Sequence, residues 1–242
     1  MAQYIYHKAD TRGHDHHEWL DSKKTFSFGD YYNPERMGFG ALRVLNDDTL
    51  PGRKGFGSHP HDNMEIISIP LKGSLVHEDS VGNKAIAATG SVQVMHAGSG
   101  LFHSEYNNSV EEEAEFLQIW IYPEDLNTSP RYTLGVLPLI TDVDVLHTFI
   151  GPGSLDGLTV RKDTWFSYGV FSSGHTFNYV IRKAANGIDV FVISGSFFVD
   201  GKLLSQRDGM GIRNATAIDI ETLGAEARLL VIEIPMDIHD QN

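Results

Sequence analysis

The strongest constraint on the fold of this chain is the alternation of short apolar runs with turn residues. The runs have the length of β-strands and are rich in β-branched and aromatic residues, between glycine, asparagine, aspartate and proline. The clearest runs are Met64–Leu71, Ser91–Met95, Phe116–Ile121, Val190–Ile193, Phe197–Val199 and Leu229–Ile234. Long stretches with a helical period are missing, so the sequence predicts an all-β sandwich or barrel, with a short helix near Pro123–Leu126.

A weak internal repeat predicts two copies of one β unit. In each half an apolar run ends in x-Gly-Ser, a turn follows about six residues later, and a further glycine opens the next run. The matching segments are Leu71–Leu75 with Asp79–Gly82 and Gly90, and Ile193–Phe197 with Asp200-Gly201 and Gly209. The segment Pro123–Pro138 is the best boundary, because prolines flank it. We therefore expect one domain over residues 1–132 and a second over 133–242.

Two short segments place possible metal ligands at positions i and i+2: His59-Pro60-His61 and His103-Ser104-Glu105. Residues at this spacing point to the same face of a β-strand. If the two strands face one another, three imidazoles and one carboxylate converge. This set suits a divalent transition metal such as iron, manganese, nickel, copper or zinc, and not calcium. Four protein ligands on an octahedral ion leave two positions open, as catalytic sites require.

Composition excludes several classes of function. The chain has no cysteine, so disulfides, thiolate metal sites and cysteine nucleophiles are excluded. A formal net charge of −13 opposes direct binding to nucleic acid. We find no signal peptide at the N-terminus and no apolar run long enough to span a bilayer, so we expect a cytoplasmic protein without a membrane partner.

Several motifs resemble the cupin superfamily and, more specifically, its two-domain pirin branch. Gly55–Gly73 resembles the first cupin motif and Gly90–Asn107 the second, although His96 stands where many cupins have proline. The resemblance to pirins rests on Arg12-Gly13-His14, Trp19-Leu20, Thr25–Phe28, Tyr31-Tyr32, Arg43–Asp48, His59-Pro60-His61, His96–Gly100, His103–Asn107 and Gln118–Ile121. The similarity is dense from about residue 5 to 132 and thinner afterwards. It is closest to bacterial pirins with quercetin 2,3-dioxygenase activity.

The resemblance implies a bicupin, with two jelly-roll barrels and one metal in the N-terminal barrel. Carried over by position, the metal ligands are His59, His61, His103 and Glu105, and the usual metal is iron. Manganese, nickel, copper, cobalt or zinc also suit this set of ligands. Residues 133–242 contain no matching pair of ligands, so the second domain is expected to be a cupin without metal.

The function implied is a dioxygenase that opens the central ring of flavonols such as quercetin. Its partners would be a small phenolic substrate and dioxygen, and we expect a monomer. Glu105 would act as a ligand and as the general base for the substrate hydroxyl. The alternative is a non-enzymatic iron protein, in which the redox state of the metal controls binding to a protein partner. An epimerase on a cupin scaffold would fit the fold and not the ligand set.

Other polar residues have competing interpretations. A second histidine cluster consists of His14, His16 and His17. Packing or solvation is the favoured interpretation, because the sequence offers no second carboxylate–histidine pair to complete a metal site. Glu65 is expected to be a hydrogen-bonding residue behind the site. Hydrogen-bonded placements are also favoured for His77 and His96. Aromatic residues that include Phe28, Phe56 and Trp120 are candidates for pocket walls or plain core.

Overall fold

The computed structural model describes residues 1–137, 142–152, 154, 158–161 and 163–237, and these confirm the predicted all-β class. Within them the only helix is the 3-10 turn η1 (Ala9–Thr11), and no helix has the length and apolar character that crossing a membrane requires. The short helix expected at Pro123–Leu126 is wrong. The segment is a series of bends, held by a hydrogen bond from Arg161 Nη1 to the carbonyl of Pro123 (2.7 Å) and by one from the Asn127 N–H to Asn63 Oδ1 (2.7 Å).

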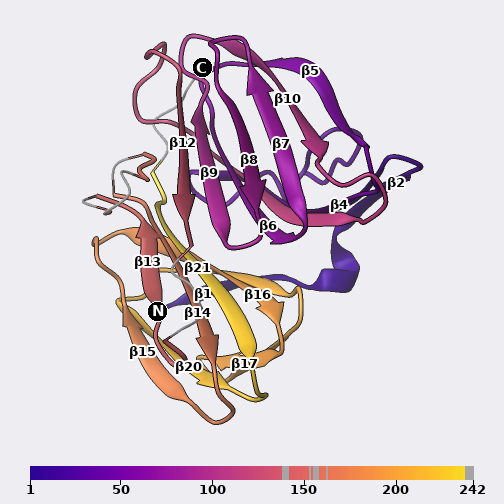
Figure 1. Cartoon of the computed structure of the whole chain (residues 1–242). Helices are drawn as coiled ribbons and strands as arrows, with labels where there is room; N and C mark the ends of the chain where they lie inside the picture. Colours follow the sequence, from indigo (N-terminus) through magenta and orange to yellow (C-terminus); the bar gives the residue numbers. More distant parts are fainter. Residues whose placement is uncertain (138–141, 153, 155–157, 162, 238–242) are drawn as a thin grey trace.

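The upper barrel in Figure 1 contains most of the N-terminal half of the chain and consists of two sheets. The seven-stranded sheet has the order β12-β9-β6-β11-β4-β3-β2, and the four-stranded sheet has the order β5-β10-β7-β8. Their bounds are β2 Gly13–His17, β3 Leu20–Lys24, β4 Leu42–Leu50, β5 Gly55–His61, β6 Glu65–Lys72, β7 Ser74–Asp79, β8 Lys84–Ala88, β9 Ser91–His96, β10 Leu101–Asn107, β11 Ala114–Ile121 and β12 Arg131–Val136.

The lower barrel repeats this plan. Its six-stranded sheet has the order β1-β19-β16-β21-β14-β13, and its four-stranded sheet has the order β15-β20-β17-β18. The bounds are β1 Gln3–His7, β13 His147–Ile150, β14 Trp165–Phe171, β15 Thr176–Val180, β16 Asn186–Ser194, β17 Ser196–Val199, β18 Lys202–Ser205, β19 Gly209–Arg213, β20 Ala217–Thr222 and β21 Ala227–Pro235. The two four-stranded sheets therefore have the same internal order.

The predicted repeat is visible in the local geometry. A single glycine separates β6 from β7 and β16 from β17, and both glycines have left-handed backbone angles: φ is 73° at Gly73 and 79° at Gly195. Residues with a Cβ adopt this conformation at a cost, which explains the x-Gly-Ser signature. The predicted hairpin turns also occur, between β7 and β8 and between β17 and β18.

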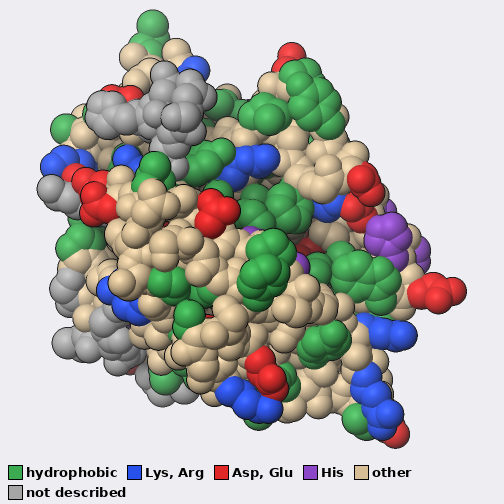
Figure 2. Space-filling model, turned by 90° about the horizontal axis from the view of Figure 1, so that it is seen from above, with side chains coloured by type: hydrophobic (Ala, Val, Ile, Leu, Met, Phe, Trp, Pro, Cys, Tyr) green, Lys and Arg blue, Asp and Glu red, His purple; other side chains and the backbone are tan. Residues whose placement is uncertain are grey.

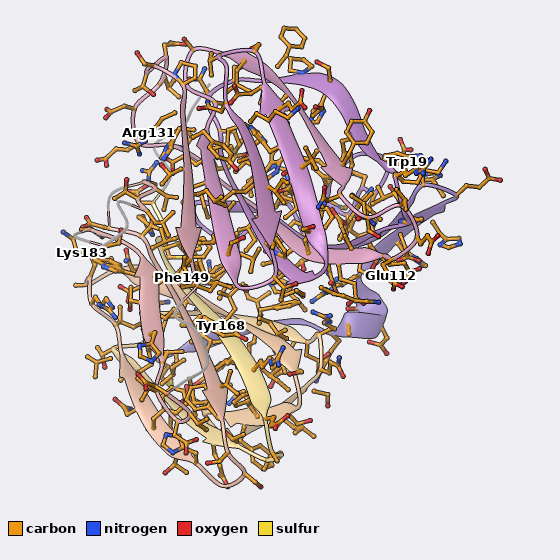
Figure 3. All side chains as sticks on the ribbon, in the orientation of Figure 1. Trp19, Glu112, Arg131, Phe149, Tyr168 and Lys183 are labelled. Atoms are coloured by element: carbon orange, nitrogen blue, oxygen red, sulfur yellow. The ribbon has the colours of Figure 1, made fainter. Side chains whose placement is uncertain are left out.

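The two larger sheets pack face to face and form the core between the barrels. Alternate residues of the seven-stranded sheet, such as Ile67 and Ile119, belong to one buried apolar cluster with Phe166, Leu230 and Ile232 of the six-stranded sheet. Figure 3 labels Phe149 and Tyr168, two further members, where the barrels meet. Because strand side chains alternate, the remaining residues of the seven-stranded sheet face the interior of the N-terminal barrel.

Strand pairing crosses the expected division at residue 132. β12 begins at Arg131 and pairs with β9 of the N-terminal barrel, while β1 pairs with β19, so it lies among the C-terminal strands in Figure 1. The division into residues 1–132 and 133–242 stays a prediction of where independent domains begin and end.

Candidate metal centre

Three predicted ligands lie together on the inner face of the four-stranded sheet of the N-terminal barrel. β5 and β10 are neighbours in one sheet and not strands that face each other across the barrel; His59 is directly opposite His103 in the antiparallel register. A ring nitrogen from each of His59, His61 and His103 lies within 4.8 Å of the others. His59 Nε2 is 3.1 Å from His103 Nε2, and the ring of His61 is centred 4.7 Å and 4.9 Å from theirs.

Two of these imidazoles, those of His61 and His103, are neutral near pH 7. Burial, together with the neighbouring imidazoles, lowers the pKa of His61 to about 4 and the pKa of His103 to about 3. A buried imidazolium beside two more would be poorly solvated and repelled. A neutral imidazole offers a nitrogen lone pair, which is the form that binds a metal. The donor set therefore fits a divalent transition metal.

The tautomer of His59 is set by the backbone. His59 Nδ1 lies 2.7 Å from the carbonyl oxygen of Gly57, which can only accept a hydrogen bond. Nδ1 therefore carries the proton, and the lone pair of Nε2 points at His103. A hydrogen bond of this kind orients histidine ligands in many metal sites.

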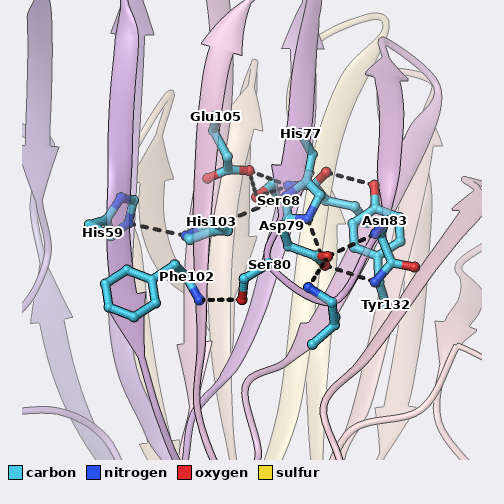
Figure 4. Close-up of polar contacts among 12 residues, drawn as sticks. His59, Ser68, His77, Asp79, Ser80, Asn83, Phe102, His103, Glu105 and Tyr132 are labelled. Carbon is cyan, nitrogen blue, oxygen red and sulfur yellow. Dashed lines mark hydrogen bonds and ion pairs between the residues drawn. The ribbon is translucent and has the colours of Figure 1, made fainter.

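Glu105 lies beside the histidines and Ser68 in Figure 4. Two amides and a hydroxyl hold its carboxylate. It is 1% exposed. Gln118 Nε2 donates to Oε2 (2.8 Å), Gln93 Nε2 donates to Oε1, and Ser68 Oγ lies 3.1 Å from Oε1. The strand register shifts between His103 and Glu105, and the group of nitrogens within 4.8 Å includes no oxygen of Glu105. The role of Glu105 as the fourth ligand stays a prediction.

The partners of Glu105 were missed from the sequence, although a signal exists for them. Ser68, Gln93 and Gln118 each stand inside an apolar run, between Ile67 and Ile69, Val92 and Val94, and Leu117 and Ile119. All three are buried and project from β6, β9 and β11 into the barrel. A single polar residue at the centre of a buried strand indicates a polar interior, because buried polar groups need partners.

Aromatic residues of the predicted walls contact this cluster. The indole of Trp120 is edge-on to the ring of His61, with centroids 4.8 Å apart, and Phe28 packs edge-on against Trp120. The ring of Phe56 is 6.2 Å from that of His59. Seen from above in Figure 2, the molecule is hollowed near its centre, with histidine atoms visible at depth between hydrophobic side chains.

A second histidine cluster lies on the exposed hairpin of β2 and β3. In Figure 2 a patch of histidine side chains is visible on this side of the molecule, at the right edge. Asp21 supplies the carboxylate that the sequence did not indicate: Oδ2 lies 3.1 Å from His14 Nε2 and 2.8 Å from His16 Nδ1. Both ring nitrogens can donate to this carboxylate, so hydrogen bonding satisfies the group without a metal. His17 instead stacks on Trp19.

Glu65 and His96 form a separate polar contact. Glu65 Oε1 is 3.1 Å from His96 Nδ1, and Glu65 Oε2 accepts the backbone N–H of Arg161. His96 Nε2 in turn lies 2.7 Å from Arg131 Nη2. These contacts match the hydrogen-bonding placement favoured for Glu65 and His96. In the described part of the chain, groups of three or more metal-binding side chains occur only around His59 and around His14.

Comparison with known proteins gives a consistent result. The quercetin 2,3-dioxygenase of Escherichia coli (strain K12) is 37% identical over 230 residues, which cover 94% of this chain and 97% of that protein. A pirin-like protein of Caulobacter vibrioides is 37% identical over 226 residues, 93% of this chain and 96% of its own. The crystal structure of the bacterial pirin YhhW from Escherichia coli in complex with nickel(II) has a TM-score of 0.90 and 37% identity, and covers 96% of this chain and 99% of that one.

Two tandem barrels whose four-stranded sheets have the same order, the first with a histidine cluster, define a bicupin. Residues 6–121 match the family model Pirin, and residues 152–234 match the model of the quercetinase C-terminal cupin domain. The chain belongs to the pirin family. The predicted fold class is confirmed, and the chain is quercetin 2,3-dioxygenase-like.

Proposed function

We propose that this chain is a metal-dependent dioxygenase that opens the central ring of flavonols such as quercetin. The observation that supports it best is the convergence of three imidazoles beside the buried carboxylate of Glu105. The names of the relatives and the nickel(II) complex of YhhW support the same proposal. His59, His61, His103 and Glu105 would hold one metal, and iron is the metal that we propose.

The metal, when bound, supplies Lewis acidity that lowers the pKa of a coordinated phenolic or enolic hydroxyl. Glu105 accepts the proton of that hydroxyl. Ser68 permits this, because its oxygen lies 2.8 Å from Gln118 Oε1 and 3.1 Å from Glu105 Oε1. One hydroxyl hydrogen serves one acceptor at a time, so a bond to Gln118 leaves Glu105 Oε1 with Gln93 as its donor and a second lone pair for a proton. The amides of Gln93 and Gln118 hold the carboxylate in place.

The direct test is an oxygen-electrode assay with quercetin on protein loaded with one metal at a time. We expect one dioxygen consumed and one carbon monoxide released for each flavonol opened. The rate should depend on the metal, because the transition metals differ in redox character. Absence of oxygen uptake across a flavonol panel with iron, manganese, nickel, copper and cobalt would reject the proposal. Partner binding that differs between ferrous and ferric protein, without turnover, would support the regulatory alternative.

Metal analysis tests the ligand set separately. We expect one metal per chain in the unaltered protein and a loss of most of it in His59→Ala and in His103→Ala, with both variants still folded because the core spans both barrels. His16→Ala is the matched control, since it removes an imidazole from the surface cluster. Unchanged metal content in His103→Ala would contradict the ligand assignment.

A further inference from the structure

Two further buried side chains, those of His77 and Asp79, lie directly behind His103. In the register between β10 and β7, His77 is opposite Glu105 and Asp79 is opposite His103. The side chains of His77 and Asp79 have no exposed surface. His77 Nδ1 is 3.5 Å from His103 Nδ1, and His77 Nε2 is 3.4 Å from Asp79 Oδ2 (Figure 4). The three side chains form a row that ends at the ring nitrogen facing His59.

Asp79 fixes the direction of this row because its carboxylate only accepts hydrogen bonds. Oδ1 accepts from the N–H groups of Val81 (3.1 Å) and Asn83 (2.8 Å), and Oδ2 accepts from Asn83 Nδ2 (2.8 Å). Burial alone would raise the pKa of Asp79, but the hydrogen bonds from Asn83 and His77 hold it below its usual value. Because Oδ2 accepts, the His77 nitrogen that faces it, Nε2, carries the proton.

The remaining protons follow from this one. With its proton on Nε2 and a lone pair on Nδ1, His77 can only accept from His103 Nδ1. His103 then carries its proton on Nδ1 and a lone pair on Nε2. The carbonyl of Gly57 imposes the same tautomer on His59. Two lone pairs therefore face each other across the 3.1 Å between the Nε2 atoms.

We infer that His77 and Asp79 are positioning residues, which hold His103 in the tautomer whose Nε2 lone pair points at His59. With the opposite tautomer, His103 Nε2–H would donate a hydrogen bond to His59 Nε2, and this bond would occupy the lone pair that a metal needs. With the tautomer that Asp79 sets, the two nitrogens repel each other until a cation lies between them. The row thus favours metal binding over the hydrogen bond, and the inference rests on the proposed metal centre.

Packing fixes the plane of the His77 ring. Tyr132 stacks on it, with centroids 4.4 Å apart and planes 24° apart. The hydroxyl of Tyr132 donates to Gln93 Oε1 (3.0 Å), and Gln93 Nε2 donates to Glu105. A histidine turned by stacking to face His103 is better placed as an oriented acceptor than as a space-filling residue.

The inference is tested by nitrogen-15 NMR of the imidazole rings in the metal-free protein, which reports the protonated nitrogen directly. We expect a proton on Nδ1 of His103 and on Nε2 of His77. In Asp79→Asn the amide can donate to His77 Nε2, which reverses the row and places the proton of His103 on Nε2. A proton on Nε2 of His103 in the unaltered protein would overturn the inference.

Metal affinity, measured by competition with a chromophoric chelator, provides the second readout. Asp79→Asn and His77→Phe should bind metal roughly 10–100-fold more weakly, the usual cost of losing such a partner. His77→Gln should retain most of the affinity, because an amide can accept from His103 and donate to Asp79. Asn83→Ala is the control for the turn, since it removes a partner of Asp79 and leaves the row intact.

The outcomes separate this inference from the proposed function. Unaltered metal affinity in Asp79→Asn and His77→Phe would reject the positioning role of His77 and Asp79. It would not contradict the proposed metal centre. Failure of the unaltered protein to bind metal through His59 and His103 would reject the proposed function. The NMR measurement would still show whether His77 and Asp79 set the tautomer of His103. Should His77→Phe fail to fold, Asp79→Asn and the tautomers of the unaltered protein give the answer.

Discussion

The two barrels share the order of their four-stranded sheets and differ in what these sheets carry on their inner faces. In the N-terminal barrel, β5, β7 and β10 present histidines and Glu105 to the interior. In the C-terminal barrel, β15, β17 and β20 present Tyr179, Phe197, Val199, Ile218 and Ile220, all part of one apolar cluster. A barrel of this size can hold either a packed core or a polar site, and the chain contains one of each.

The N-terminal barrel has two small apolar clusters of its own, around Phe116 and around Ile66, and shares a larger one with the other barrel. The outer face of its seven-stranded sheet packs on the six-stranded sheet of the other barrel, through residues such as Ile67, Leu117 and Ile232. The C-terminal barrel has apolar side chains both in its interior and on this interface. The difference teaches that the second barrel stabilises the first, which leaves the interior of the first available for chemistry.

The largest expected effect lies in the polar barrel. Glu105→Gln preserves the shape of the side chain and removes its charge and basicity, so turnover should fall roughly 10²–10⁴-fold even when excess metal restores occupancy. The measurement is the initial rate of oxygen uptake against metal content. Full activity at restored occupancy would assign the proton transfer to another group.

The second effect lies in the apolar barrel. Phe197 is fully buried at the centre of the C-terminal cluster, so Phe197→Ala should lower the free energy of unfolding by about 3–5 kcal/mol. Metal content should stay unchanged, because the metal centre lies in the other barrel. Denaturant unfolding with metal analysis checks both, and Leu203→Ala, at an exposed position on β18, is the control. Loss of metal from Phe197→Ala protein that is still fully folded would contradict the proposal that only the N-terminal barrel determines metal binding.

The smallest effect is a dependence on pH that belongs to the polar barrel. Burial lowers the pKa of His103 to about 3 and that of His61 to about 4, against 6.5 for the free side chain. Below pH 6.5 the unfolded chain therefore binds protons that the folded chain does not. The contribution of these two histidines to the stability of the metal-free protein should therefore fall as the pH drops from 6.5 towards 3.

His103→Gln isolates this effect. Asp48, whose pKa is raised to about 7 by burial, acts in the opposite direction, but it does so in both proteins. The difference in unfolding free energy between the two proteins, measured from pH 7 to pH 4, should shrink or change sign as the pH falls. A difference independent of pH would show that His103 titrates as an ordinary histidine.

The sequence predicted the fold class and the repeat because both depend on local patterns. Strand-length runs and the glycines at positions 73 and 195 are visible without any contact between distant residues. The candidate metal centre was predicted as far as strand periodicity reaches: i and i+2 spacing placed His59 and His61 on one face. The pairing of β5 with β10 as neighbours depends on which strands become adjacent, and spacing does not encode this.

The residues that the sequence did not reveal depend on which strands pair, whether these are near or distant along the chain. Asp21 meets His14 because β2 and β3 form a hairpin, and no motif marked that pair. Ser68, Gln93 and Gln118 meet at Glu105 from three strands that are adjacent in the sheet and distant in sequence. The helix predicted near Pro123 failed because side chains of other segments hold that backbone in bends.

The pairing of β1 with β19 also determines the order in which the chain completes its fold during synthesis. Gln3 lies opposite Arg213, so β1 leaves the ribosome long before its partner strand has been made. Until then the backbone N–H and C=O groups of β1 have no partner strand, and the N-terminal barrel does not supply one. A nascent chain halted after the first barrel should therefore expose residues 1–7 to protease, and their protection should appear only once β19 has been added.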